Sequence, residues 1–306
     1  MMKRIALSSA LALAVGAGTA GAAPLVLPSD TPVYFQFNNL EQANLSNSLI
    51  VPGGYNGVLT QGNWGVFNVS SMQLGGVSIP HVDIGGGPAF FSDDGPGGTN
   101  GMITGIIAGI QATSATTANG GFVDIYWHDA GADLTLGATL AAEASCLAGT
   151  TCTPSAATVT AFTSGTFLAR LVFASGINSA NAAIFQQSTT DPTTINASGE
   201  TDSFLNVDLT KVGAWTAALN GDWFTTAFGT RDVRLSNFFN GLPSWAVPAN
   251  TDPLCGTAGH PACGTTVGLR SNDPGRVFTA ATVPEPATLT LLGLGLAGLA
   301  RRRKKA

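Results

Sequence analysis

The stretch TPVYFQF, residues 31–37, decides the fold. Val33, Phe35 and Phe37 occupy every second position, and more polar side chains stand between them. Successive side chains of a strand point to opposite faces of a sheet, so this spacing is typical of a strand with one buried face. The segment therefore predicts a half-buried β-strand.

The same kind of pattern recurs along the chain. Short runs rich in aromatic and β-branched residues are separated by glycines, which supply turns. We expect strands at residues 62–74, 77–84, 101–112, 121–128, 133–140, 165–174, 203–209, 223–228, 232–239 and 276–282. The glycine-containing run 101–112 could also form a short helix. Gly229 predicts a hairpin between the runs at 223–228 and 232–239.

Few segments favour anything other than strand. Residues 212–220 predict a helix, because Trp215 and Leu219 lie one helical turn apart. Residues 113–119 and 188–198 contain Ser, Thr, Asn and Ala without periodicity and predict disorder. No internal repeat is present, which excludes solenoids and propellers. Many short strands with turn signals between them predict a mainly β protein, an antiparallel β-sandwich of jelly-roll type.

The charge of the chain is concentrated at its two ends. The 306 residues carry a net charge of −5, with 13 Lys and Arg against 18 Asp and Glu. Between Pro24 and Pro284 only six of these cations remain, against seventeen acids, so this body carries −11. Such a surface repels phosphate backbones and excludes nucleic acid as a partner. It suits a soluble secreted surface, or one that recruits divalent cations.

The N-terminus has the layout of a signal peptide. Lys3 and Arg4 precede an apolar run at 5–15, and Ala20-Gly21-Ala22 offers a site for signal peptidase. Residues 1–23 are therefore expected to be removed. The mature chain would begin near Pro24, with a secreted β-rich ectodomain over 24–282.

The C-terminus has three parts in a fixed order. Residues 287–300 are uncharged, and at about 21 Å their helix would be short for a bilayer core of about 30 Å. It could insert as a single transmembrane helix if the lipid thins locally. The run follows Val283, Pro284, Glu285 and Pro286 and precedes the basic tail Arg301, Arg302, Arg303, Lys304 and Lys305. The basic tail would keep that end in the cytoplasm by the positive-inside rule.

This layout resembles the PEP-CTERM sorting signal of Gram-negative bacteria, which is also labelled an ice-binding-protein C-terminal domain. The resemblance covers residues 283–306. It implies an exosortase as processing partner, with transient anchoring in the inner membrane before transfer to the cell surface or extracellular matrix. Carriers of the signal commonly accompany exopolysaccharide and biofilm functions. A plain anchor that is never cut is the alternative.

Four cysteines form two local pairs in loops. Cys146 lies near Cys152, and Cys255 lies near Cys263. An exported chain meets an oxidising compartment, so we expect two disulfides between near neighbours, the favoured one of three connectivities. A metal site that uses His260 with Cys255 and Cys263 is the alternative, and it lacks a fourth ligand.

Two acidic loops are weak calcium candidates. Asp93 and Asp94 precede a glycine-rich turn, and Asp129 and Asp133 flank another. Carboxylates in flexible turns suit Ca²⁺, but neither loop fits an EF-hand, and Asp and Gly are also ordinary turn formers. We therefore expect no metal or other cofactor, with calcium as the alternative.

The sequence contains no recognisable catalytic motif. His81 lies two residues before Asp83, and His128 precedes Asp129, but no nucleophile elbow or metal-binding spacing accompanies them. We expect no enzyme, and instead a structural or adhesive protein of the cell surface or extracellular matrix. A carbohydrate- or calcium-dependent binding module is the alternative, and a secreted hydrolase would need two carboxylates in a cleft. The candidate sugar-stacking aromatics are Tyr126, Trp127, Trp215, Trp223 and Trp245, although core positions are the commoner role of such residues.

Overall fold

The computed structural model describes most of the body between Pro24 and Pro284. The described residues are 24–28, 32–56, 58, 60–75, 77–79, 82–84, 87–93, 99–129, 156–194, 197–240, 267–270 and 275–280. The strands are β1 (Pro32–Ala43), β2 (Asn63–Leu74), β3 (Val77–Ile79), β4 (Val82–Ile84), β5 (Ala89–Ser92), β6 (Met102–Ala112), β7 (Thr117–Asn119), β8 (Phe122–His128), β9 (Thr166–Ala174), β10 (Gln186–Ser188), β11 (Ser198–Val207), β12 (Phe224–Thr226), β13 (Gly229–Arg231), β14 (Val233–Asn240), β15 (Val267–Arg270) and β16 (Gly275–Ala280). The helices are α2 (Ala156–Thr163) and α3 (Thr216–Leu219).

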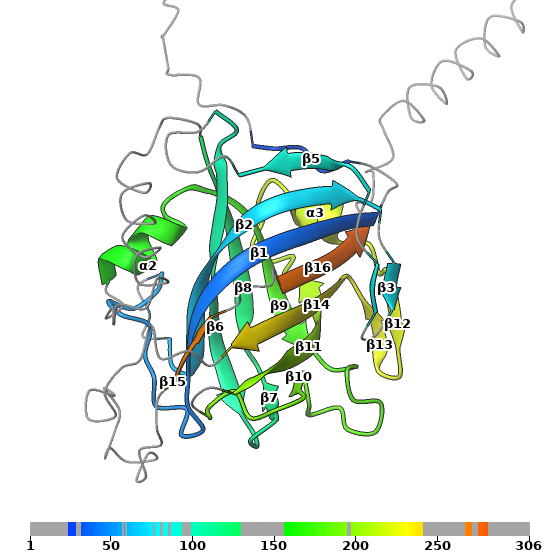
Figure 1. Ribbon diagram of the computed structural model, residues 1–306. Helices are drawn as coiled ribbons and strands as arrows, with labels where there is room; N and C mark the ends of the chain where they lie inside the picture. The colour runs from blue at the N-terminus through cyan, green and yellow to red at the C-terminus, as the bar shows by residue number, and fades with distance from the viewer. Residues whose placement is uncertain are drawn as a thin grey trace, which may run out of the picture.

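The mainly β prediction is confirmed, with antiparallel pairing between the strands. The two-sheet sandwich is wrong, because the long strands form one sheet that closes on itself. The order around the ring is β1, β2, β6, β8, β9, β11, β14 and β16, and β16 pairs with both β14 and β1. Neighbours in the ring follow one another along the chain, and Figure 1 shows them as one curved wall.

The closing strand decides between the two architectures. In the register of β16, Ala280 opposes Pro32 and Gly275 opposes Phe37, while β15 continues the pairing along β1 as far as Ala43. A sandwich would leave sheet edges exposed, whereas here the last strands hydrogen-bond to the first. The body is therefore a closed cylinder of strands, and the strand expected at 276–282 completes it.

The interior of the cylinder is filled by the alternating side chains that the sequence indicated. Val33, Phe35 and Phe37 of β1 belong to one large buried cluster with inward side chains of β2, β6, β8, β9, β11 and β14. Phe37 packs on Phe67 of β2 with ring centroids 5.4 Å apart. The period-two pattern of β1 therefore predicts correctly which side chains are buried. Because the sheet closes into a ring, these side chains pack against the inward side chains of the other strands.

A second apolar cluster covers part of the outside of the cylinder. Trp64, Ile106 and Tyr126 face outward and pack under the segment 44–62 and under α2, which contributes Phe162. Figure 1 shows α2 outside the curved wall, beside β2, β6 and β8. These strands are therefore buried on both faces.

One end of the cylinder is closed by a small plug. Trp215, just before α3, packs on Phe35 with ring centroids 5.8 Å apart. Its Nε1 donates a 2.6 Å hydrogen bond to the carbonyl oxygen of Leu25, which ties the N-terminal segment to this end. Leu27 and Leu219 join the same interior cluster. This end is therefore apolar and filled.

Several local predictions need correction. The run 223–239 is not one hairpin: β12 pairs with β13, and β14 leaves to pair with β11. The helix expected at 212–220 is reduced to the single turn α3. Residues 113–119 and 188–198, expected to be disordered, include β7 and the beginning of β11, and β10 ends at Ser188. The run 101–112 is strand β6, as expected, while the strand expected at 133–140 lies outside the described residues.

No helix within the described ranges has the length and apolar character needed to cross a bilayer. The transmembrane helix expected at 287–300 lies outside those ranges.

Candidate functional site

The inward-facing side chains change character along the cylinder. On β1 the inward positions run from Val33, Phe35 and Phe37 to Asn39 and Glu41, because alternate residues of a strand share a face. The other strands change in the same direction: β11 presents Val207 and Leu205, then Ser203 and Thr201, and β14 presents Val233 and Leu235, then Asn237. The end opposite the apolar plug is therefore polar inside.

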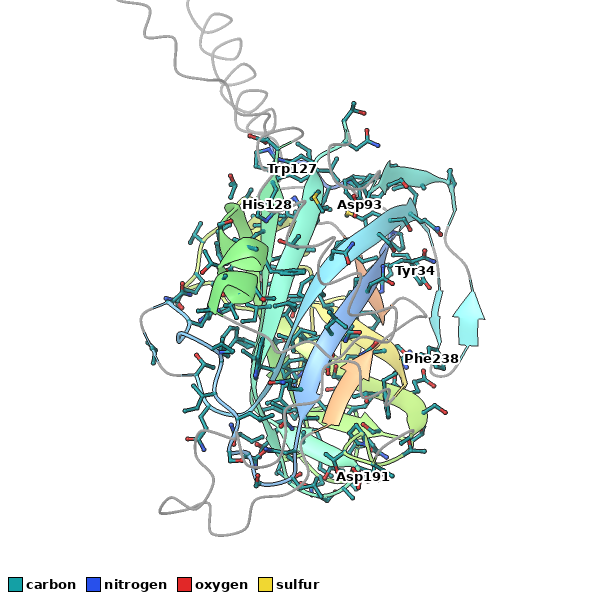
Figure 2. The ribbon with its side chains drawn as sticks, turned by 60° about the vertical axis from the view of Figure 1, so that its left-hand side comes forward. Tyr34, Asp93, Trp127, His128, Asp191 and Phe238 are labelled. Carbon is teal, nitrogen blue, oxygen red and sulfur yellow. The ribbon has the colours of Figure 1, made fainter. Side chains whose placement is uncertain are left out.

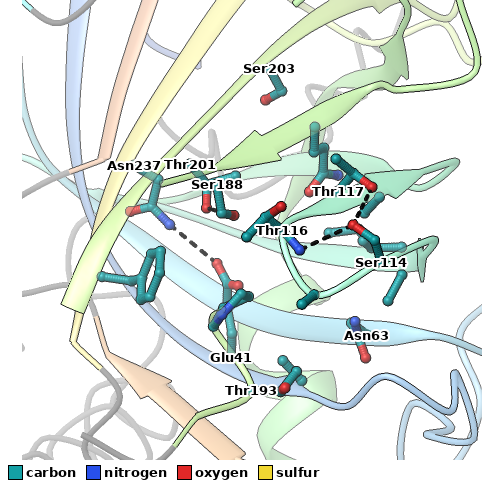
Figure 3. A pocket seen from close by; sticks show the side chains of 18 of the residues that line it. Glu41, Asn63, Ser114, Thr116, Thr117, Ser188, Thr193, Thr201, Ser203 and Asn237 are labelled. Atoms are coloured by element: carbon teal, nitrogen blue, oxygen red, sulfur yellow. Dashed lines mark hydrogen bonds between the residues drawn. The ribbon is translucent and has the colours of Figure 1, made fainter. Parts of the chain in front are cut away.

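This polar end contains a cavity of about 80 Å³. Figure 3 shows Glu41, Ser203 and Asn237 projecting into it from three different strands. Apolar walls are supplied by side chains that include Ile107, Ile110, Phe173, Leu235 and Phe239. We call this space the interior cavity.

Small hydroxyl side chains line the interior cavity where β7 and β10 cross the open end. Ser188 of β10 and Thr201 of β11 share a hydrogen bond of 2.6 Å between their hydroxyl oxygens. Thr117 of β7 and Ser114 share another of 2.7 Å. Hydroxyl groups both donate and accept, so this rim can adapt its hydrogen bonds to a polar guest.

Three strongly buried side chains leave polar atoms without a hydrogen-bond partner among the described residues. They are Gln186 through Nε2, Ser203 through Oγ and Asn237 through Oδ1, and the exposed fractions of these residues are 7%, 1% and 8%. All three line the interior cavity. Such buried polar atoms are normally paired, and leaving one unpaired costs about 1–3 kcal/mol. These three atoms therefore indicate a binding position, where a polar ligand would supply the missing hydrogen bonds.

Glu41 is the single titratable side chain among the described residues that line the cavity. Asn39 donates to its Oε1, and Asn237 Nδ2 makes a long hydrogen bond of 3.5 Å to the same oxygen. Burial raises the pKa of Glu41 to about 7, and the hydrogen bond from Asn39 offsets part of this effect. The carboxyl therefore lies close to its titration point near neutral pH.

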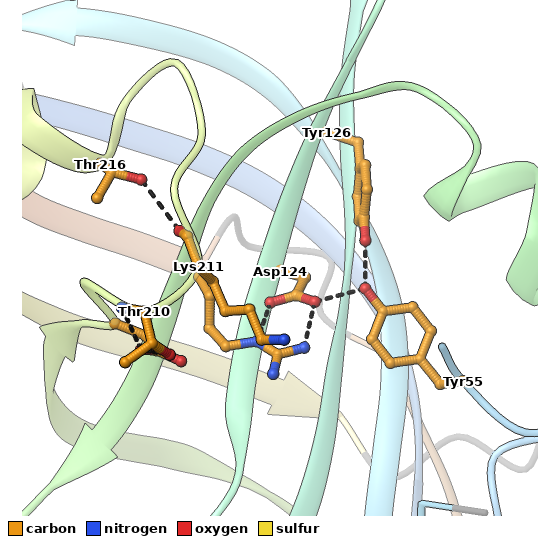
Figure 4. A network of polar contacts seen from close by, with 8 residues as sticks. Tyr55, Asp124, Tyr126, Thr210, Lys211 and Thr216 are labelled. Atoms are coloured by element: carbon orange, nitrogen blue, oxygen red, sulfur yellow. Dashed lines mark hydrogen bonds and ion pairs between the residues drawn. The ribbon is translucent and has the colours of Figure 1, made fainter. Parts of the chain in front are cut away.

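A second polar cluster, on the outside of the cylinder, is internally satisfied. Arg170 makes a bidentate ion pair with Asp124, with distances of 2.6 and 2.7 Å. Tyr55 donates a 2.5 Å hydrogen bond to the same carboxylate and is also bonded to Tyr126 (Figure 4). Arg170 also lies 4.1 Å from the centroid of the Phe122 ring. Because its charges are matched to one another, this cluster fastens the segment 44–62 to the sheet and offers no open binding position.

The acidic loops do not come together among the described residues. Asp93 accepts a 3.1 Å hydrogen bond from Asn68, and Asp129 accepts one of 2.8 Å from Trp127 Nε1. Asp94 and Asp133 lie outside the described residues. In the part of the chain that the structure describes, no three His, Cys, Asp or Glu side chains converge as metal ligands would. Calcium binding by these loops stays a prediction.

The histidine and aromatic candidates are mostly buried where they are described. His128 Nε2 lies 2.8 Å from Thr104 Oγ1, which donates to the carbonyl oxygen of Phe162. Figure 2 places His128 beside Trp127 near one end of the cylinder, away from Asp191 at the other. Tyr126, Trp127 and Trp215 belong to the two buried clusters, whereas the exposed fraction of Trp223 is 48%. His81, His260 and Trp245 lie outside the described residues.

The expected sorting and disulfide residues also lie outside the described residues. These are Val283 to Pro286, Arg301 to Lys305, Cys146, Cys152, Cys255 and Cys263. Comparison with known protein families bears on the first two groups. Residues 282–304 match the PEP-CTERM protein-sorting motif.

The PEP-CTERM motif identifies an exported protein that an exosortase processes through a membrane-anchored intermediate. No other family matches the chain. No curated protein and no solved structure matches it either. The function of the cylinder therefore has to be argued from its own side chains.

Proposed function

We propose that this exported protein is a carbohydrate-binding module of the cell surface or extracellular matrix, and that the interior cavity holds one sugar residue. The observation that carries the proposal is the set of unpartnered polar atoms of Gln186, Ser203 and Asn237 in one cavity. Exosortase processing would deliver the module to the exopolysaccharide or biofilm, where sugar binding would make it adhesive.

The chemistry of the cavity suits a sugar. Hydroxyl-rich ligands need partners that both donate and accept, and Ser188, Thr201 and Ser203 provide them beside the amides of Gln186 and Asn237. The rings of Phe173 and Phe239 can cover the apolar face of a pyranose. The volume of about 80 Å³ lies well below the several hundred Å³ of a drug-sized site, so the cavity can bury only part of one sugar ring and cannot enclose an oligosaccharide.

The proposal is binding without turnover. Glycoside hydrolysis uses two carboxyl groups on either side of the scissile bond. Glu41 is the one carboxyl among the described lining residues, and amides and hydroxyls surround it. This arrangement supports recognition of a sugar over its cleavage.

The test is a titration of the exported protein with monosaccharides, followed by isothermal calorimetry. We expect at least one hexose to bind, and Ser203→Ala to weaken its affinity about three- to tenfold through loss of one hydrogen bond. Thr225→Ala is the matched control, because Thr225 is exposed on β12 outside the cavity. If no sugar binds, or if both variants bind like the parent, the sugar site is wrong.

A further inference from the structure

We propose that the sugar held in the interior cavity carries a protonated amine and that Glu41 is its counter-ion. This inference rests on the proposed sugar site and names the chemical class of its ligand. The class is a hexosamine with a free ammonium group, in contrast to a neutral hexose or an N-acetylated one.

The first argument is the excess of hydrogen-bond acceptors around Glu41. Asn39 and Asn237 use their amide N–H groups on the carboxylate, so that Asn39 Oδ1 and Asn237 Oδ1 are left without partners among the described residues. Of the two, Asn237 lines the cavity. The exposed fractions of the two asparagines are 3% and 8%. The Glu41 carboxylate and the free Asn237 oxygen together need a donor with more than one N–H group, which an ammonium group supplies and a single hydroxyl does not.

The second argument is that no cationic side chain among the described residues lies at this position. The described lining residues include no Lys, Arg or His. Elsewhere in the described fold, two buried carboxylates have such partners: Asp124 pairs with Arg170 at 2.6 Å and Asp202 pairs with Arg234 at 2.7 Å. Buried charges are normally paired in native proteins, and among the described residues the carboxylate of Glu41 has amide partners but no cationic one.

The third argument is long-range attraction. The body between Pro24 and Pro284 carries a net charge of −11. A cationic sugar is drawn toward such a surface, whereas an anionic sugar is repelled. Within the cavity, the hydroxyl groups of the sugar ring would hydrogen-bond to two kinds of side chain. These are the hydroxyls of Ser188 and Thr201 and the unpartnered polar atoms of Gln186 and Ser203.

The experiment compares three matched sugars by calorimetry at pH 7.5 on the exported protein. Glucosamine carries the ammonium, glucose replaces it with a hydroxyl, and N-acetylglucosamine keeps the nitrogen without the charge. We expect glucosamine to bind at least tenfold more tightly than either of the others. This comparison needs no variant, so it stands even if a substitution at Glu41 prevents folding.

The variant Glu41→Gln then identifies the counter-ion. It should weaken glucosamine binding about tenfold or more and abolish the preference for glucosamine over glucose. The control is Glu200→Gln, the same exchange at a carboxyl that does not line the cavity.

Two negative outcomes are distinguishable. If glucose or N-acetylglucosamine binds as tightly as glucosamine, the amine is wrong and the sugar site survives. If none of the three binds, the sugar site fails as well. Equal loss of glucose and glucosamine binding in Glu41→Gln would also overturn the counter-ion assignment.

Discussion

At the scale of single residues, Glu41 is the position where folding and binding make opposite demands. Its carboxyl lies inside the cylinder with two amide partners, and burial raises its pKa to about 7. A protein optimised for stability alone would place a neutral side chain here, as it does at Val33, Phe35 and Phe37 on the same face. A costly charged group in a cavity is characteristic of a binding position.

The raised pKa of Glu41 predicts how stability depends on pH. The folded state holds the proton between the unfolded value of 4.5 and about 7, so the contribution of Glu41 is full below pH 4.5 and lost as pH rises through 7. Glu41→Gln imitates the protonated form. It should raise the free energy of unfolding at pH 8 by on the order of 2 kcal/mol and should give no gain at pH 4.

Urea unfolding of the parent and the variant at the two pH values measures this difference. Thr225→Ala, at an exposed residue of β12 without a titratable group, serves as the control and should change stability equally at the two pH values. An equal effect of Glu41→Gln at pH 4 and pH 8 would mean that the carboxyl titrates normally.

At the scale of elements, the segment 44–62 depends on a polar anchor. It links β1 to β2 across the outside of the sheet, and Tyr55 reaches the Asp124–Arg170 pair from it. The exposed fraction of Asp124 is 1%, and burial raises the pKa of Tyr55 far above its usual value, so Tyr55 stays protonated and donates. The Asp124 carboxylate therefore connects Arg170 of the neighbouring strand β9 with Tyr55 of the segment 44–62.

Removing that carboxylate should loosen both elements. Asp124→Asn leaves Arg170 without its counter-ion and should lower the free energy of unfolding by about 3 kcal/mol. Tyr55→Phe removes one neutral donor and should cost about 1 kcal/mol. Asp191→Asn is the control, because an amide oxygen can still accept both hydrogen bonds that Thr193 donates.

Denaturant unfolding gives these costs, and limited proteolysis between residues 44 and 62 reports release of the segment. The anchor would be refuted if Asp124→Asn were as stable as Asp191→Asn.

The sequence predicted elements better than it predicted their arrangement. Period-two alternation located β1, and runs of apolar and β-branched residues bounded by glycines located β2, β6, β8 and β9. These patterns could not distinguish a sandwich from a closed sheet, since both bury alternate side chains and only the long-range pairing of β16 separates them. The sequence did not predict the helix α2, because Ala156–Thr163 has no strong apolar stripe. Its position on the outer face of the sheet depends on contacts with distant strands.

Part of the candidate site could have been predicted from the sequence. The inward positions of β1 change from Phe37 to Asn39 and Glu41, a polar switch on one face that could have indicated a cavity. The segments around β7 and β10 gave no such signal, because their Ser and Thr side chains suit a disordered loop equally well. They are ordered by pairing with β6 and β11, which local sequence does not reveal.

At the scale of the whole molecule, the cavity and the last described residue before the sorting signal lie at opposite ends of the cylinder. Ala280, the last residue of β16, opposes Pro32 beside the apolar plug, and the PEP-CTERM match begins at residue 282. Glu41 is nine residues along β1, about 30 Å away at strand spacing. While the chain is still anchored, the open end of the cylinder would thus point away from the membrane.

This geometry predicts that release is not required for binding. Glu285→Ala should block exosortase processing and leave full-length protein in the inner membrane fraction, because the altered residue is the centre of the sorting motif. The retained protein should bind glucosamine with the affinity of the released form within twofold, since the strand that leads to the motif ends beside the plug and away from the cavity. Glu200→Gln should be released normally.

Immunoblots of membrane and secreted fractions report processing, and radiolabelled glucosamine on washed membranes reports binding. Normal release of Glu285→Ala would overturn the role of the motif, whereas retention with lost binding would show that the membrane covers the cavity end.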